Sequence, residues 1–345
     1  MNIHGFFGLL SAFFINNNII LVNKKSVIVK KNRYIQKKAL DIVKILKQWS
    51  QSAGNSLVLV DNTLDKAGTS ETLRNEIVTQ LETVKPVSIH VPIHLKPSND
   101  EQFGHYLAGL IDGDGHISSK QQIVITFNIL DIKLAYFIKK RLGYGSVQKI
   151  NNKNAVNLVI ASAKGIENVI TLINGKFRTN SKFTQISENI LSNVKFKDFS
   201  KISRLEKNSS DNLDNHWLAG FSDADASFQI KLIDRNDRTE VRLNFQIDQK
   251  QNYLLVLIKN YLGGNLGYRE SQDTYYYGST SFGVARKVIK YFDNYHLLSS
   301  KHINYLKWRK AYIHVQNKEH LNKAGSQKIT KLKASMNRLY VESTI

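Results

Sequence analysis

HYLAGLIDGDG, at residues 105–115, and HWLAGFSDADA, at residues 216–226, are two versions of one stretch that the chain contains twice. The second version begins 111 residues after the first (216 − 105 = 111), which leaves room for a small mixed unit of helices and strands after each copy. Recurrence at this distance predicts two copies of one supersecondary unit. We therefore expect function where the two copies meet.

Within each copy the side chains are sorted by helical spacing. Apolar residues recur at i, i+3 and i+4, which is typical of one buried helix face. Small residues lie four apart on another face, where they let two backbones approach closely. Each stretch is therefore predicted to be a short helix that packs against its twin. The interface is expected at Gly109, Gly113, Gly220 and Ala224.

Two aspartates end each copy, Asp112 and Asp114 in the first and Asp223 and Asp225 in the second. A carboxylate at a helix C-terminus is unfavourable, because the macrodipole is already negative there. Pairing the helices in parallel would also bring like charges together. Mg²⁺ would relieve both effects, since it prefers hard carboxylate oxygens. The alternative is that these aspartates only end the helices beside glycine. Their doubling within one chain favours the metal.

The two stretches resemble the signature helices of the LAGLIDADG homing endonucleases, in the single-chain form that carries two motifs and includes intron-encoded endonucleases and maturases. The first copy matches the nine-letter pattern except at Gly113. The second departs from it at Phe221, Ser222 and Ala226 but keeps the aspartate in the eighth place, Asp225. The resemblance covers residues 100–340, about two thirds of the chain.

Composition fits a nucleic-acid partner. The 49 Lys and Arg residues exceed the 28 Asp and Glu residues and give a formal charge of +21, which favours a polyanion; an acidic membrane is the rival partner. Cysteine is absent, which excludes disulfides, thiolate zinc sites and cysteine nucleophiles. The abundance of Asn, Lys, Ile and Tyr is the bias of an A+T-rich gene and indicates an organelle, the mitochondrion before the plastid.

The first hundred residues lie outside the resemblance, and their role is not readable from the sequence. Residues 6–22 are apolar but too short and too polar for a membrane span, so we expect a buried strand or helix there, or the remnant of a fusion to upstream coding sequence. Residues 24–49 predict a basic amphipathic helix, and residues 61–84 a more polar one. Prolines between Pro86 and Pro97 oppose regular structure. We expect an extension at 1–99, a first repeat at 100–208 and a second repeat at 209–345.

After each signature helix the hydrophobic period changes from helical to alternating. Each half predicts the order α-β-β-α-β-β-α, which the resemblance also implies. The fold class is thus α+β: two pseudo-symmetric subdomains paired through the signature helices, each with an antiparallel sheet. By resemblance the two sheets form a saddle over a DNA duplex.

One face of the second half's strands is polar, and it could read bases. Arg, Lys, Asn and Gln carry donors and acceptors that match base edges in the major groove, where a β-ribbon fits. Each of these residues taken singly could instead face only water, but together they favour a nucleic-acid surface. The predicted set is Gln229, Lys231, Arg242, Asn244, Gln246 and Lys250.

By resemblance, Asp114 and Asp225 are the eighth-place acids that hold metal, with backbone groups of Gly113 and Ala224 beside them. Asp112 and Asp223 are expected to cap and brace the helix ends instead. Metal ions between the two acids can bind both the nucleophile and the leaving oxygen of a phosphodiester.

The resemblance also implies further catalytic residues. Lys176 and Lys301 match the lysines of the two half-sites, and Asp131 and Gln249 match the residues that position solvent. Lys182 is a competitor for the role of Lys176. The basic tail at residues 302–340 is expected to be helical, and its cations could follow the nucleic-acid backbone or simply face water.

The sequence thus predicts a monomeric, site-specific double-strand DNA endonuclease that depends on Mg²⁺, with ions such as Mn²⁺ able to substitute. It would cut a long asymmetric target and promote intron mobility. The alternative is an RNA-binding maturase that assists splicing of its host intron, with or without DNA cleavage. Retention of both acids favours cleavage, because a splicing factor has no use for two unpaired aspartates at a helix seam.

Overall fold

The structure is a computed structural model that describes residues 85–196, 199, 204–235 and 238–337. All of these belong to one of the two units into which the chain divides, Val78–Ile345. The predicted apolar segment at 6–22 and the predicted helices at 24–49 and 61–84 lie outside the described residues. Along the part that is described, no helix combines the length and apolar character that crossing a membrane requires.

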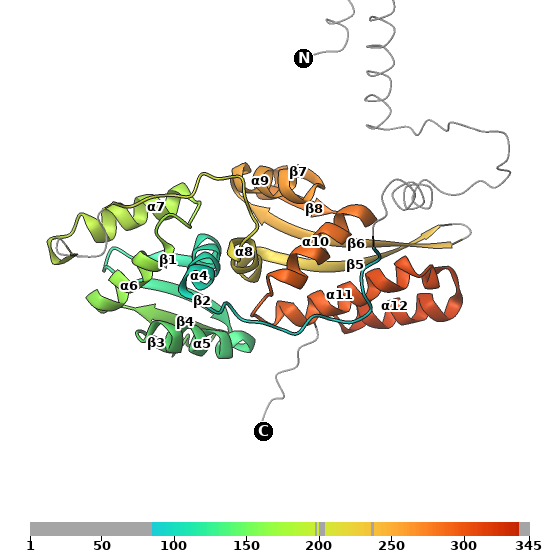
Figure 1. Cartoon of the computed structure of the whole chain (residues 1–345), viewed down its shortest axis with the longest axis horizontal. Helices are drawn as coiled ribbons and strands as arrows, with labels where there is room; N and C mark the ends of the chain where they lie inside the picture. The colour runs from blue at the N-terminus through green and yellow to red at the C-terminus, as the bar shows by residue number, and fades with distance from the viewer. Residues whose placement is uncertain (1–84, 197–198, 200–203, 236–237, 338–345) are drawn as a thin grey trace, which may run out of the picture. The chain divides into compact units, whose positions relative to one another are not determined.

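The two signature stretches form helices that lie side by side. They are α4 (Asp100–Asp114) and α8 (Trp217–Asp225), and Figure 1 shows them between the two sheets. The backbones touch where small residues were expected. A Cβ added to Gly109 would lie 1.9 Å from the Trp217 carbonyl oxygen, and one added to Gly220 would lie 1.9 Å from that of Tyr106. Only glycine allows an approach this close.

The first half continues from α4 in the predicted order. Its elements are β1 (Gly115–Ile117), β2 (Ile123–Asn128), α5 (Ile132–Leu142), β3 (Ser146–Lys149), β4 (Ala155–Ile160), α6 (Ala163–Ile173) and α7 (Asn180–Ile186). The strands form an antiparallel sheet in the order β1-β2-β4-β3. Helix α5 is capped by Gly143, whose φ of 75° is a left-handed conformation that glycine adopts readily.

The second half repeats this arrangement from α8 onward. Its elements are β5 (Ala226–Arg235), β6 (Arg238–Gln249), α9 (Tyr253–Leu262), β7 (Asn265–Arg269), β8 (Thr274–Ser279), α10 (Phe282–Asn294), α11 (Lys301–Gln316) and α12 (Lys323–Ser335). The sheet order β5-β6-β8-β7 matches that of the first half. The predicted α+β fold, with an α-β-β-α-β-β-α order in each half and antiparallel sheets, is confirmed.

Alternation along the strands separates an apolar face from a polar one. On β5, Phe228 and Ile230 are buried, and the Phe228 ring lies 5.6 Å from the ring of Trp308 on α11. Gln229 and Lys231 point to the other face, because successive strand residues alternate. Helix α11 therefore covers the apolar face of this sheet, and the polar face lies on the opposite side from α11.

The extended segment at residues 85–98 precedes the first half in the chain but is held by the second. The Gln316 side chain accepts a hydrogen bond from the Val87 amide (2.8 Å) and donates one to the Val87 carbonyl (3.0 Å). Arg309 donates to the His90 carbonyl at 3.1 Å. We call residues 85–98 the strap, since it runs along α11 before the chain enters α4.

Candidate active site

Asp114 and Asp225 end the paired helices α4 and α8, so their carboxylates come together at the seam. A Cβ on Gly113 would lie 2.3 Å from the Ala224 Cβ and 3.0 Å from the Asp225 carboxylate Oδ2. The Asp225 carboxylate thus crosses the seam and reaches the backbone beside Asp114. Asp114 is exposed and Asp225 is half-buried. The space between their two carboxylates, which we call the notch, is therefore open to solvent on one side.

The electrostatics of this notch call for a cation. Desolvation, with repulsion from Asp114 second, raises the pKa of Asp225 to about 6. Desolvation also raises the pKa of Asp114, against the attraction of Lys301 and Lys182. Two acids that resist ionisation while sitting at negative helix ends are a ready site for positive charge.

Asp112 and Asp223, the other two acids, are buried and fully used as braces. The Asp112 carboxylate accepts hydrogen bonds from the backbone amides of Arg178 (2.7 Å) and Thr179 (3.1 Å), at the start of α7. The Asp223 carboxylate likewise accepts one from the Leu298 amide at 2.7 Å, just before α11. Each acid therefore seats the N-terminus of a later helix, where negative charge is favoured.

Each brace is completed by a side chain from the other half. The Trp217 indole Nε1 donates to Asp112 at 2.8 Å, and the Tyr106 hydroxyl donates to Asp223 at 2.6 Å. Tyr106 and Trp217 occupy the same place in the two copies, immediately before Leu-Ala-Gly. Because tyrosine in one copy is tryptophan in the other, this shared role as a hydrogen-bond donor is not visible in the sequence.

Lys301 lies at the acid pair. Its Nζ donates to the carbonyls of Ala224 (2.6 Å) and Ser222 (3.2 Å), in the last turn of α8. The ammonium therefore caps the C-terminal end of that helix. Burial lowers its pKa, while attraction to Asp223 first, and then to Asp114 and Asp225, raises it. The Ala224 carbonyl, expected beside the metal, is thus engaged by a lysine.

Lys176 is not brought to the acid pair. Its Nζ forms an ion pair with Glu101 at 3.1 Å, in the first turn of α4, about 20 Å along the helix from Asp114 at 1.5 Å per residue. Lys182 lies near the acids instead: burial lowers its pKa, and Asp112, Asp225 and Asp114 raise it. Lys176 and Lys182 can be told apart by their distance in sequence from the residue that bonds Asp112.

The spacing from the brace to a lysine is similar in the two halves. Asp112 bonds the Thr179 hydroxyl, and Asp223 bonds the Ser299 hydroxyl. Lys182 follows Thr179 by three residues, and Lys301 follows Ser299 by two. A lysine shortly after the hydroxyl that meets the brace is therefore the feature that both halves share.

The two residues expected to position solvent differ in their surroundings. The Gln249 side chain donates from Nε2 to Asp225 Oδ2 at 2.7 Å, so it orients that carboxylate. Asp131 accepts hydrogen bonds from the Ser300 amide (2.6 Å) and hydroxyl (3.2 Å). Asp131 thereby links the first half to the start of α11, next to Lys301.

The polar face of β5 and β6 holds its predicted residues in register. Gln229 is paired with Asn244, and Lys231 with Arg242. Lys231 is exposed, but Asn244 is only 4% exposed, and its Nδ2 donates to the Gln246 Oε1 at 3.1 Å. Asn244 therefore holds its neighbours more than it faces solvent. Lys250 is exposed just beyond β6.

Comparison with known proteins agrees with this geometry. A family model described as LAGLIDADG endonuclease matches residues 218–312. A 37.2 kDa protein of cox1 intron 2 from Schizosaccharomyces pombe, itself uncharacterised, is 66% identical, and the match covers 84% of this chain and 86% of that one. The chain belongs to the LAGLIDADG endonuclease family.

Two more distant proteins extend the comparison. The intron-encoded DNA endonuclease aI3 of Saccharomyces cerevisiae is 31% identical over 64% of this chain and 65% of its own length. The LAGLIDADG meganuclease I-AabMI, solved bound to uncleaved DNA, shares the fold, with a TM-score of 0.54 and 23% identity over 68% of this chain and 99% of that one.

A divalent metal fits the residues that this LAGLIDADG chain presents at the seam. The donors there are two carboxylates and backbone oxygens, which are hard ligands of the kind that Mg²⁺ and Ca²⁺ take. Desolvation raises the pKa of both acids even with Lys301 and Lys182 nearby, and a bound cation would favour their charged forms.

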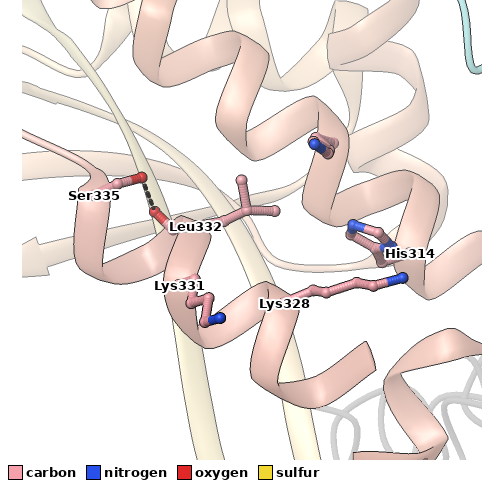
Figure 2. Close-up of a pocket in the computed structure, with 6 residues that line it drawn as sticks. His314, Lys328, Lys331, Leu332 and Ser335 are labelled. Atoms are coloured by element: carbon pink, nitrogen blue, oxygen red, sulfur yellow. Dashed lines mark hydrogen bonds between the residues drawn. The ribbon is translucent and has the colours of Figure 1, made fainter. Parts of the chain in front are cut away.

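A second cationic feature lies on the helical layer. Lys310, His314, Lys328, Lys331, Leu332 and Ser335 line a pocket between α11 and α12 (Figure 2). Glu319 balances part of the pocket's charge: its carboxylate lies 2.8 Å from Nδ1 of His314 and forms an ion pair with Lys328 at 3.5 Å. Because α11 covers the apolar face of the second sheet, this pocket and the polar strand face lie on opposite sides of that sheet.

Proposed function

We propose that this protein is a site-specific double-strand DNA endonuclease that hydrolyses phosphodiesters with Mg²⁺ and promotes the mobility of its intron. The observation that carries the proposal is the seam of α4 and α8, where Asp114 and Asp225 meet with Lys182 and Lys301 close by. The other two acids of the motif, Asp112 and Asp223, accept hydrogen bonds that hold the starts of later helices. Asp114 and Asp225 are therefore the acids that remain to bind a metal ion.

Asp114 and Asp225, with the backbone beside Gly113, would hold the divalent ion, and Mn²⁺ would substitute for Mg²⁺. Bound there, the ion would supply an activated water and charge stabilisation for the phosphate. Gln249 fixes the Asp225 carboxylate by its 2.7 Å hydrogen bond. One acid from each half would serve one strand of the duplex, so a single chain would suffice as a monomer.

Lys182 and Lys301 would stabilise the charge that develops on the phosphate. Both lysines are half-buried, and an ammonium in a lower local dielectric attracts a phosphoryl oxygen more strongly than it does in water. Lys301 is also fixed by two carbonyls of α8, at 2.6 and 3.2 Å. A preorganised cation of this kind needs little reorganisation during the reaction.

The duplex would lie across the polar faces of the two sheets. Gln229, Lys231, Arg242 and Gln246 are placed on one such face, and the formal charge of +21 supplies attraction to phosphate. Because the two halves differ in sequence, they would read different half-sites. The target is therefore expected to be long and asymmetric.

The test is cleavage of a DNA substrate that spans the intron-free insertion junction, in Mg²⁺, with binding measured in parallel. Asp114→Asn and Asp225→Asn should reduce cutting by about 100-fold or more while binding persists. Unchanged cutting in both variants would refute the assignment.

The lysines offer a matched comparison in the same assay. Lys301→Met and Lys182→Met should slow single-turnover cleavage by about 100-fold, the typical loss for one electrostatic group. Lys176→Met, which removes a lysine paired with Glu101, should change the rate by less than about threefold. A larger loss for Lys176→Met than for Lys182→Met would reverse the roles of the two lysines.

A second candidate function is binding of the host intron RNA as a maturase, in the mitochondrion. The lysine-lined pocket between α11 and α12 favours it, because that pocket lies across the sheet from the polar strand face and a second polyanion could bind there. Adding the protein should then lower the Mg²⁺ needed for splicing of the precursor. Lys328→Glu with Lys331→Glu should remove this effect and leave DNA cleavage within about threefold.

A further inference from the structure

A histidine of the strap meets two histidines that lie about 200 residues later in the chain. His94 belongs to the strap, His296 follows α10, and His302 lies in the first turn of α11. One ring nitrogen from each of the three lies within 4.8 Å of the others. The His94 and His302 rings are 4.3 Å apart between centroids, and the His94 and His296 rings are 5.2 Å apart.

Two of these imidazoles carry buried polar atoms with no protein partner. Nδ1 of His296 and Nδ1 of His302 are buried and meet no hydrogen-bond partner among the described residues. Such atoms are rare in folded proteins, because leaving a buried polar atom unpaired costs about 1–3 kcal/mol. Two of them lie in this one cluster, where a bound cation would satisfy both.

His296 is buried and His302 is half-buried, and burial disfavours the charged form of an imidazole. Burial first, and repulsion from His94 and His296 second, lower the pKa of His302 to about 4. Burial lowers the pKa of His296 as well, with His94 second and the carboxylate of Asp293 opposing them. Protonated imidazoles would repel both one another and a cation.

The surroundings of His94 also resemble the outer shell of a metal ligand. Its Nε2 lies 2.8 Å from the Leu297 carbonyl oxygen. With Nε2 protonated, His94 donates to that carbonyl and presents Nδ1 as a free lone pair. Metal-binding histidines commonly donate their other ring nitrogen to a backbone carbonyl in this way.

We propose that His94, His296 and His302 form a tris-imidazole site for a first-row transition cation, with Zn²⁺ foremost. Imidazole suits Zn²⁺, Cu²⁺ and Ni²⁺, whereas Mg²⁺ prefers the carboxylates of the seam. Nitrogens around tetrahedral Zn²⁺ are about 3.3 Å apart for bonds of about 2.0–2.1 Å. Small ring movements would close the cluster, and a water would fill the fourth position.

Bound metal would fasten the strap to the second half. His94 is the strap's ligand, and the other two ligands flank Leu298 and Ser299, which hold Asp223. The site joins segments that are more than 200 residues apart in sequence, since 302 − 94 = 208. A cross-link of this span would order both the strap and the turn that leads into α11.

The experiment uses the full chain without a polyhistidine tag, stripped with a chelator and titrated with Co²⁺ at pH 7.5. One equivalent should bind and give the visible absorption of tetrahedral or five-coordinate Co²⁺, which Zn²⁺ should displace and Mg²⁺ should not. His94→Gln should weaken Co²⁺ binding by more than about 100-fold, beyond the 10–100-fold loss typical of an outer partner. His94 is exposed, so this variant should fold.

His90→Gln is the matched control, because His90 is an exposed histidine on the same strap. It should bind Co²⁺ as the native protein does. Asp114→Asn should also retain the signal, which separates this site from the acid pair. Zn²⁺ should further slow amide hydrogen exchange in residues 85–98 of the native protein but not of His94→Gln.

The absence of a stoichiometric Co²⁺ site, or equal binding by His94→Gln and the native protein, would overturn the proposal. The three rings would then be only a packed aromatic cluster.

Discussion

Replacement of Asp225 by asparagine should stabilise the protein in the absence of divalent metal. The two side chains have nearly the same shape, and the amide oxygen of the introduced asparagine can still accept the hydrogen bond that Gln249 makes at 2.7 Å. What changes is the charge. The folded state holds a carboxylate whose pKa is raised from 3.8 to about 6, by desolvation first and by Asp114 second.

The sign and size follow from proton linkage. Because the folded state binds the proton more tightly than the unfolded state, Asp225 lowers stability as the pH rises from about 4 to about 6. The full difference corresponds to about 3 kcal/mol above pH 7 (2.2 × 1.36), and about 1 kcal/mol of it is already present at pH 4.5. Solvent reaches part of this side chain, so these values are upper bounds.

The assay is urea unfolding with a chelator present, at pH 4.5 and pH 7.5, for the native protein and Asp225→Asn. The stability gained by the variant should be up to about 2 kcal/mol larger at pH 7.5 than at pH 4.5. Comparing the two pH values cancels any effect of the substitution that does not depend on pH. Asp211→Asn, at an exposed position, should show no such change.

Adding Mg²⁺ should narrow the gap at pH 7.5, because the ion binds the folded native protein and stabilises it by mass action. A variant that is no more stable than the native protein at pH 7.5, or a gap that does not grow with pH, would refute the account of the seam as a strained anionic site.

Two further predictions concern the seam and its braces. Gly220→Ala should lower the free energy of unfolding by about 3 kcal/mol or more, because its Cβ would lie 1.9 Å from the Tyr106 carbonyl oxygen. Gly283→Ala is the control: a Cβ there meets nothing within 4 Å, so this variant should be neutral or stabilising. Equal melting temperatures of the two variants would contradict this prediction. Tyr106→Phe should cost about 1–3 kcal/mol, because it removes the buried donor to Asp223. Tyr277→Phe removes a buried hydroxyl that has no partner among the described residues and should cost nothing in urea unfolding; equal losses would count against the brace.

The fold could be predicted from the sequence because it depends on features that repeat along the chain. Small residues four apart predicted the close helix pair, and the crossing of Gly109 with Gly220 realises it. Alternation along β5 and β6 predicted which side chains share a face, and their register agrees. Both signals are local, so counting residues suffices to read them.

Of the site, only the residues within the repeated helices could be placed from the sequence. The position of Asp114 and Asp225 follows from the helix pair, but Lys176 and Lys182 lie six residues apart across a turn, since 182 − 176 = 6. Which of them faces the acids depends on how Asp112 seats the start of α7. The strap's attachment to α11 depends on pairs such as Val87 with Gln316, which no local pattern reveals.

The crossed hydrogen bonds from Tyr106 to Asp223 and from Trp217 to Asp112 restrict how such a chain can be recombined. A chimeric nuclease that took one half from a relative would also import that half's donor, and it would have to find an acceptor in the half that stayed. Grafts that keep an aromatic hydrogen-bond donor before Leu-Ala-Gly should fold as single units. Grafts that lose this donor would leave the buried aspartate of the retained half without one of its hydrogen bonds.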